Sequence, residues 1–228
     1  PGGGYWLTKL DGTLEEWDED GLKKRQWQTP ANATHQVRAG RYIVSVNPDS
    51  LLLTDVESGR GRAVSFPEGW QGGNISAFDR LRGNEIAAYS GTQGAFLKLD
   101  TDFASPEAIT FTAEALDAGR AMYRKQEQAA RANFHPGGTT AQASSAVLLP
   151  GIAADGNGKV FAIATPLKKA AANILQFTAD GVQERAYALD LRAALGQDAM
   201  LPVRLLARGR SLMLISGNGL AQVFELPR

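Results

Sequence analysis

Histidine, the side chain most often used for acid–base catalysis, is scarce in this sequence. The 228 residues contain only His35 and His135, so a serine–histidine–aspartate triad would need one of them. No Gly-x-Ser-x-Gly element, which places a nucleophilic serine on a sharp turn, occurs in the chain. His135 precedes Pro136-Gly137-Gly138, a helix-ending sequence, and a helix C-terminus favours a cation. We therefore expect surface or capping roles for both histidines and assign no catalytic residue.

Carboxylates are concentrated near the start of the chain. Glu15-Glu16-Trp17-Asp18-Glu19-Asp20 holds five of them in six residues, and Lys23-Lys24-Arg25 follows. Alternate residues of a strand share a face, so Glu15 and Trp17 would lie on one face. Glu16 and Asp18 would lie together on the other face. Such a pair could bind a cation or perform acid–base chemistry. Charges paired across a turn also stabilise a solvated hairpin, and this is what we expect here.

A second acidic segment, Asp155-Gly156-Asn157-Gly158, is superficially like the start of a calcium-binding loop. It lacks the later ligands, because Gly158–Ala164 has the pattern of a strand. A tight turn is the expected structure, and no cofactor is expected. A divalent metal such as calcium stays an open alternative, to which Asp155, Asp79 and Glu85 could contribute.

One aromatic residue and a group of cations are the candidates for a binding surface. Trp70, in Trp70-Gln71-Gly72-Gly73, falls between two groups of strands, where a large apolar side chain suits binding. Ala113–Phe134 lacks strand alternation and is rich in helix-forming residues. We expect a partner protein to contact Trp70 and four residues of this helix: Arg120, Tyr123, Arg124 and Arg131.

The composition excludes several classes of protein and of site. The 24 Lys and Arg residues balance 24 Asp and Glu residues, which argues against a nucleic-acid partner. The absence of cysteine removes disulfides, zinc–thiolate sites and thiol nucleophiles. The longest apolar stretch, Ala146–Ala154, is interrupted by Pro150 and is far shorter than the roughly 20 residues needed to span a bilayer. No membrane insertion is therefore expected.

These residues must be positioned by a repeated group of short strands. A glycine, a polar residue and an apolar run recur as a unit, which predicts a buried strand each time. The copies are Gly40–Val46, Gly83–Tyr89, Gly158–Ala164 and Gly209–Ile215, with a partial copy at Gly4–Thr8. Further apolar segments precede and follow most copies, and Asp-Gly or Ser-Gly turns such as Asp180-Gly181 separate them.

The repeat predicts an all-β fold, a β-propeller of about five four-stranded blades in a single domain spanning residues 1–228. Four short antiparallel strands in roughly 40–45 residues is the period of a propeller blade. The helical stretch lies in an insertion at about residues 113–145. The first unit has no inner strand and the last has no outer strand, so we expect the N-terminal strands to close the ring. The alternative is a fragment of a six- or seven-bladed propeller.

Two segments carry a resemblance to known propellers. Ile152–Ala164, with its Asp155-Gly156-Asn157-Gly158 turn, and Ile174–Gly181 resemble a blade of the NHL and SMP-30/gluconolactonase-like proteins. Leu53-Thr54-Asp55-Val56-Glu57-Ser58-Gly59 is similar to the end of a quinoprotein-type blade. The resemblance implies the propeller superfamily without a specific family. Gluconolactonase-like enzymes bind a divalent metal in the central channel, but no residue here matches those ligands position by position.

The function we expect is that of a non-catalytic protein-interaction or scaffold module in an exported bacterial protein, periplasmic or extracellular, within a possible larger assembly. Propeller function usually lies in loops on one face and at the mouth of the channel. The alternative is a metal-dependent lactonase or esterase-like hydrolase that uses channel carboxylates.

Overall fold

The computed structural model describes residues 5–9, 11–28, 35–91, 93–102, 105–114, 149, 151–164, 171–190 and 204–227, together with 116, 117, 120, 121, 125 and 128. These residues form five antiparallel sheets in chain order. Sheet 1 contains β1 (Tyr5–Thr8), β2 (Thr13–Trp17) and β3 (Lys23–Gln28). Sheet 2 contains β4 (Gln36–Ala39), β5 (Tyr42–Val46), β6 (Ser50–Asp55) and β7 (Gly61–Ser65).

The remaining sheets continue the same order. Sheet 3 contains β8 (Ala77–Arg82), β9 (Glu85–Ser90), β10 (Ala95–Asp100) and β11 (Pro106–Thr110). Sheet 4 contains β12 (Gly151–Ala154), β13 (Lys159–Ala164), β14 (Ala171–Thr178) and β15 (Gln183–Asp190). Sheet 5 contains β16 (Arg204–Arg208), β17 (Ser211–Ile215) and β18 (Ala221–Glu225).

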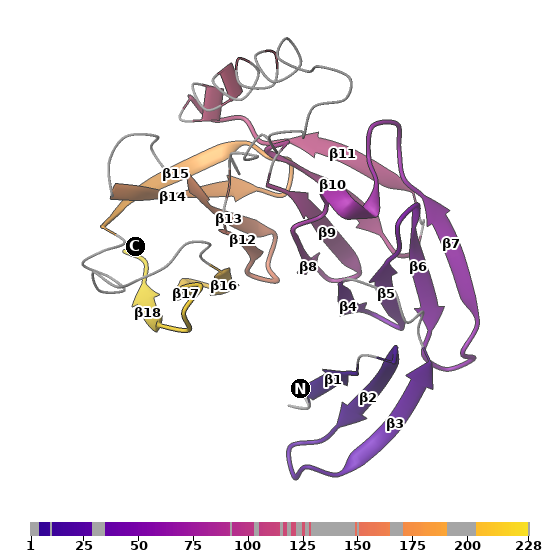
Figure 1. The fold of residues 1–228 in the computed structure, drawn as a ribbon. Coiled ribbons are helices and arrows are strands. Elements are labelled where there is room, and N and C mark those ends of the chain that lie inside the picture. Colours follow the sequence, from indigo (N-terminus) through magenta and orange to yellow (C-terminus); the bar gives the residue numbers. More distant parts are fainter. Residues whose placement is uncertain are drawn as a thin grey trace, which may run out of the picture.

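The sheets follow one another around an arc (Figure 1). The first strands of sheets 2 to 5 are neighbours, with β4 beside β8, β8 beside β12 and β12 beside β16. Sheets 1 and 5 form the two ends of the arc, and a gap separates them (Figure 1). Within the described residues no strand of sheet 1 pairs with a strand of sheet 5.

The predicted blades are confirmed, with a correction at the two ends. Sheets 2, 3 and 4 have four strands, but sheets 1 and 5 have three. The expectation that the N-terminal strands close the ring is wrong for the described part of the chain. By its place in the repeat β1 matches the second strand of a blade, so among the described residues sheet 1 has no first, inner strand. β18 matches the third strand, so sheet 5 has no fourth, outer strand there. A strand of sheet 1 therefore does not complete sheet 5.

The core lies between successive sheets, where apolar side chains of neighbouring sheets pack together. Sheets 3 and 4 are joined by a row of aromatic rings: Tyr89, Phe96, Phe111 and Phe177, with successive centroids 5.7, 5.2 and 4.5 Å apart. Between sheets 4 and 5, Phe161 and Ile163 pack with Leu212 and Leu214. The junction of sheets 1 and 2 is smaller, with Leu14, Ile43, Val56 and Trp27.

Hydrogen bonds and turns between nearby residues explain the turn at Asp155 and the start of β8. The Asp155 carboxylate accepts hydrogen bonds from the N–H groups of Asn157 (2.7 Å) and Lys159 (3.0 Å), which confirms the tight turn expected there. β8, which precedes the Gly83–Tyr89 copy, begins at Ala77, because Gly72–Asn74 forms a short 3-10 turn, η1.

The insertion after β11 is described only at its root. Leu116 is fully buried in the core between sheets 3 and 4, and the described residues among 114–128 have helical backbone. The rest of the expected insertion lies outside the described residues. In the described part of the chain no helix has the length and apolar character needed to cross a membrane.

Candidate functional site

The candidate binding residues lie at one end of the sheets. In antiparallel sheets successive turns alternate between the two ends. One end, which we call the loop face, carries turns 47–49, 91–94 and 216–220 and the connections between sheets, including 66–76. The other end, the turn face, carries tight turns such as 56–60, 155–158 and 179–182.

Trp70 is positioned by a turn of its own loop. The N–H of Trp70 donates to the carbonyl oxygen of Pro67 at 3.1 Å. Inside this turn Gly69 has a φ of 82°, a left-handed conformation that favours glycine. The Trp70 side chain is half-buried and packs against the core between sheets 2 and 3. Part of the ring is therefore held by the fold and part remains available at the loop face.

The Trp70 loop is fastened to the turns on either side. The N–H of Gly72 donates to the carbonyl oxygen of Pro48 at 2.7 Å, and a Cβ on Gly72 would lie 2.1 Å from the backbone oxygen of Asn47. Only glycine therefore permits this approach. On the other side the Nε2 group of Gln93 donates to the carbonyl oxygen of Gly69 at 3.2 Å. The loop is consequently preorganised.

Arg120 anchors the root of the insertion. Its guanidinium donates to the backbone oxygens of Phe111 (2.6 Å) and Gly94 (3.0 Å) and pairs with the carboxylate of Asp117 at 3.1 Å. Its side chain is 20% exposed, so part of the cation stays accessible at the loop face. The other three predicted contact residues, Tyr123, Arg124 and Arg131, lie outside the described residues, as does His135.

A second group of polar residues lies along the inner strands, where sheets 2, 3 and 5 approach the axis of the arc. His35 precedes β4, Asp79 lies on β8, and Arg204 begins β16. Burial and the nearby charge of Arg204 lower the pKa of His35, while its hydrogen bond to the backbone of Ile75 opposes them. His35 is half-buried.

Asp79 joins sheet 3 to sheet 4. One of its carboxylate oxygens accepts a hydrogen bond from the N–H of Ala154 at 3.2 Å. Burial raises the pKa of Asp79 to about 6, against the opposing effects of that hydrogen bond and of Arg204. Tyr89 faces the same junction, and its fully buried hydroxyl has no hydrogen-bond partner among the described residues. Burial, with the charges of Asp79 and Asp155, raises the pKa of Tyr89.

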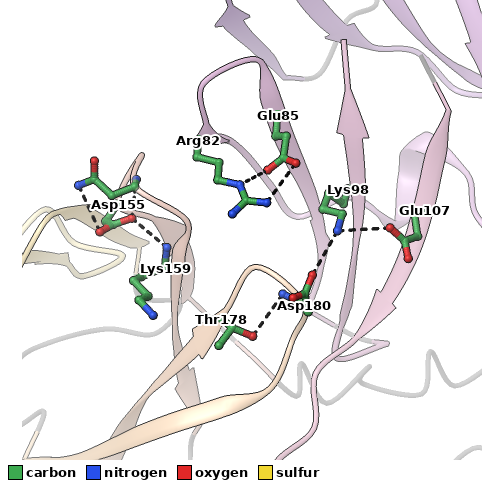
Figure 2. Close-up of polar contacts among 9 residues, drawn as sticks. Arg82, Glu85, Lys98, Glu107, Asp155, Lys159, Thr178 and Asp180 are labelled. Atoms are coloured by element: carbon green, nitrogen blue, oxygen red, sulfur yellow. Dashed lines mark hydrogen bonds and ion pairs between the residues drawn. The ribbon is translucent and has the colours of Figure 1, made fainter. Parts of the chain in front are cut away.

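Two of the carboxylates considered as metal ligands, Glu85 and Asp155, have partners within the protein (Figure 2). Glu85 pairs with Arg82 at 2.5 Å, and Asp155 holds its own turn. Lys98 lies 3.3 Å from Glu107 of its own sheet and 3.3 Å from Asp180 across the junction of sheets 3 and 4 (Figure 2). Among the described residues no group of three or more His, Asp or Glu is placed to hold a metal ion.

The acidic segment near the start of the chain forms the expected charged hairpin. Glu15 is covered by its own hairpin, with 3% of its side chain exposed, and its carboxylate accepts from Lys9 at 2.8 Å and from the indole of Trp17 at 3.2 Å. Trp17 and Glu15 therefore share a face, as predicted. Glu16 lies on the other face, 3.9 Å from Arg25 and 3.7 Å from Arg38 of sheet 2.

Comparison with known proteins identifies the fold but no family. No family model and no curated protein matches the sequence. Many solved structures match in three dimensions, at low sequence identity. The WD40 repeats of RRP9 align over 98% of this chain with a TM-score of 0.57 and 7% identity. The chain has a β-propeller fold.

Two enzymes have the same architecture. A catalytically inactive variant of virginiamycin B lyase from Staphylococcus aureus, solved with quinupristin, aligns over 99% of this chain with a TM-score of 0.54 and 11% identity. Hydrazine synthase of Kuenenia stuttgartiensis aligns over 92% with a TM-score of 0.51 and 10% identity. This chain spans 54% of the hydrazine synthase chain, 59% of RRP9 and 63% of the lyase.

Several residues of these sites escaped the sequence analysis. Gln93 and Arg204 had no sequence signal, because a single glutamine or arginine is common on any surface. Asp79 was considered only as a metal ligand. It lies directly after Phe78 in a strand that also contains Arg80 and Arg82, so the sequence carries no clear signal that this carboxylate is buried.

Proposed function

We propose that this propeller is a non-catalytic protein-interaction or scaffold module of an exported bacterial protein, periplasmic or extracellular, and that the loop face binds a partner protein. The observation that supports this most is the fastened Trp70 loop. A preorganised loop loses less conformational entropy on binding than a free one, and a half-exposed tryptophan is a typical anchor of protein interfaces.

The proposed contact surface combines Trp70 with the insertion residues Arg120, Tyr123, Arg124 and Arg131. Tryptophan, tyrosine and arginine are the residue types most enriched among residues that dominate interface energetics. Loops on a rigid scaffold commonly carry binding function in repeat and sandwich folds. The same architecture occurs in WD40 repeats and in enzymes, so the proposal depends on this surface rather than on the fold.

A quantitative pull-down tests the proposal. The immobilised chain is incubated with periplasmic extract of the organism that encodes it, and recovered proteins are quantified for wild type, Trp70→Ala and an Arg124→Ala/Arg131→Ala variant. We expect the specifically recovered protein to fall about tenfold or more for Trp70→Ala, as for an interface hot spot. Val182→Ala, at an exposed position on the turn face, is the control. Equal recovery by wild type and Trp70→Ala would overturn the proposal.

A hydrolase is the second candidate. The group of His35, Asp79 and Arg204 along the inner strands is the observation that favours it. Asp79, with its raised pKa, and His35 both lie within the electrostatic reach of Arg204. The test is hydrolysis of a panel of lactones and esters by wild type and Asp79→Asn, with elemental analysis for bound calcium. Turnover that is lost in Asp79→Asn would support the enzyme and contradict the non-catalytic proposal.

A further inference from the structure

The turn 91–94, between β9 and β10, lies between the two elements of the proposed partner surface. On one side is the connection 66–76, which carries Trp70, and on the other is the insertion between β11 and β12. Gly91 and Gly94 of this turn are buried, whereas Gln93 is exposed. Hydrogen bonds from both elements end on these three residues.

The peptide group that leads into Trp70 is bonded on both sides. Its N–H, which belongs to Trp70, donates to the carbonyl oxygen of Pro67 at 3.1 Å. Its carbonyl oxygen, which belongs to Gly69, accepts from the Nε2 group of Gln93 at 3.2 Å. Because a peptide group is planar, two bonds on opposite sides fix its orientation. They therefore set the direction in which the Trp70 side chain leaves the backbone.

The end of the Trp70 connection is bonded to the same turn. The N–H of Gly91 donates to the hydroxyl of Ser76 at 3.1 Å, and this hydroxyl donates to the carbonyl oxygen of Tyr89 at 3.2 Å. Ser76 is the last residue before β8. Gln93 thus bonds the connection close to Trp70, and Gly91 bonds it where it enters the next sheet.

The segments that flank the insertion also meet at this turn. On the side where the insertion begins, the N–H of Phe111 and the guanidinium of Arg120 both donate to the carbonyl oxygen of Gly94, each at 3.0 Å. On the side where it ends, the N–H of Leu149 donates to the carbonyl oxygen of Gly91 at 3.1 Å. A movement of the turn would therefore disturb both the insertion root and the Trp70 loop.

The backbone of Gln93 is itself fixed, so its side chain has a defined origin. The N–H of Gln93 donates to the hydroxyl of Ser90 at 3.3 Å, and the N–H of Gly94 donates to the carbonyl oxygen of Ser90 at 3.0 Å. The oxygen of Gly69 can only accept, so Gln93 must present its amide nitrogen to it. A carboxylate of the same size would have no donor to offer.

We propose that the turn 91–94 joins the Trp70 loop and the insertion root into one cooperative binding unit, in which Gln93 is the positioning residue for Trp70. A partner that orders one element then lowers the entropic cost of ordering the other. This role in binding rests on the proposed function of the loop face. The coupling itself is a property of the free chain and can be measured without a partner.

Fluorine NMR of the chain labelled with fluorotryptophan tests the positioning role. Trp70→Phe identifies the Trp70 resonance. Gln93→Glu should shift or broaden this resonance, because glutamate cannot donate to the oxygen of Gly69, whereas Gln93→Lys keeps a donor and should stay close to wild type. Gln71→Glu is the matched control, since it adds the same charge beside Trp70 and its side chain has no hydrogen bond within the described residues.

Hydrogen exchange of the free chain tests the coupling. Arg120→Met removes the guanidinium from Gly94 without altering the Trp70 loop itself. It should speed exchange of the Trp70 amide as well as the Phe111 amide, by about threefold or more, a fraction of the factor expected for losing one charge-assisted hydrogen bond. Lys98→Met, a matched change at the opposite end of β10, should leave the Trp70 amide unchanged.

The pull-down separates positioning from direct contact with the partner. Gln93→Ala should lower recovery, and adding it to Trp70→Ala should cause no further loss, because Gln93 acts through Trp70. Additive losses would overturn the positioning role. So would an unchanged Trp70 resonance in Gln93→Glu, or unchanged Trp70 exchange in Arg120→Met. If wild type recovers no partner, the proposed function fails, while the NMR and exchange results still decide this inference.

Discussion

Asp79 shows how a single buried carboxylate couples pH to stability. Its folded-state pKa of about 6 lies above its usual value of 3.8, so the folded state binds the proton more tightly than the unfolded state does. The resulting stabilisation is complete below about pH 4 and is lost as pH rises through 6. At neutral pH the ionised side chain therefore destabilises the junction of sheets 3 and 4.

We predict that Asp79→Asn raises the free energy of unfolding at pH 7.5 by on the order of 1–3 kcal/mol. Asparagine keeps an oxygen acceptor for the N–H of Ala154 and removes the charge. Urea unfolding of both proteins from pH 4 to pH 8 measures the difference, which should vanish near pH 4. Asp49→Asn, at an exposed aspartate of the turn 47–49, is the control. A difference that is independent of pH would contradict the assigned pKa.

Gly72 is required because no side chain fits at its position. The backbone oxygen of Asn47 leaves no room for a Cβ, and a backbone atom can give way only if the loop moves. We predict that Gly72→Ala lowers the free energy of unfolding by about 1–3 kcal/mol, the usual cost of overpacking, and shifts the Trp70 fluorescence. In the adjacent Gly73 a Cβ would meet nothing within 4 Å, so Gly73→Ala should leave both measurements close to wild type.

At the scale of elements, sheets 3 and 4 are joined by both an ion pair and a row of rings. Lys98 reaches Asp180 and Glu107, but both carboxylates are well exposed, at 75% and 63%. Exposed ion pairs contribute little, because water and salt screen them. Phe111 and Phe177, in contrast, are fully buried with centroids 4.5 Å apart.

We therefore predict unequal effects of two substitutions at this junction. Phe111→Ala should lower the free energy of unfolding by about 3–5 kcal/mol, and Lys98→Met by about 1 kcal/mol or less. Chemical denaturation measured in low and high salt distinguishes the two contributions, since only the lysine effect should depend on salt. A larger loss for Lys98→Met than for Phe111→Ala would show that charge, not packing, holds the sheets together.

At the scale of the whole molecule, an open arc has ends that differ from its middle. Sheets 2, 3 and 4 are covered on both faces by neighbouring sheets, whereas sheets 1 and 5 each pack on one side within the described residues. Local opening requires less free energy where fewer apolar contacts are lost.

Native-state hydrogen exchange should therefore show a gradient along the arc. We predict that amides of β2 and β17 exchange through openings of lower free energy than amides of β9 and β13. Equal protection of all five sheets would mean that the arc unfolds as a single unit.

The sequence alone determined the repeat and much of the local structure. A glycine followed by a polar residue and an apolar run marks each second strand, because a positive-φ turn and a two-sided core impose that pattern locally. The turn at Asp155 and the sharing of a face by Glu15 and Trp17 were predictable for the same reason. Both depend on neighbours within a few residues along the chain.

Tertiary structure decided how these units meet. The burial of Asp79, the clamp on Gly72 and the backbone contacts of Arg120 all involve groups from a different sheet or turn, so no local pattern encodes them. The repeat also could not predict the open arc, because ring closure depends on which strands become neighbours at the two ends. Strand pairing between distant segments is set by long-range packing, which no pattern within a single repeat encodes.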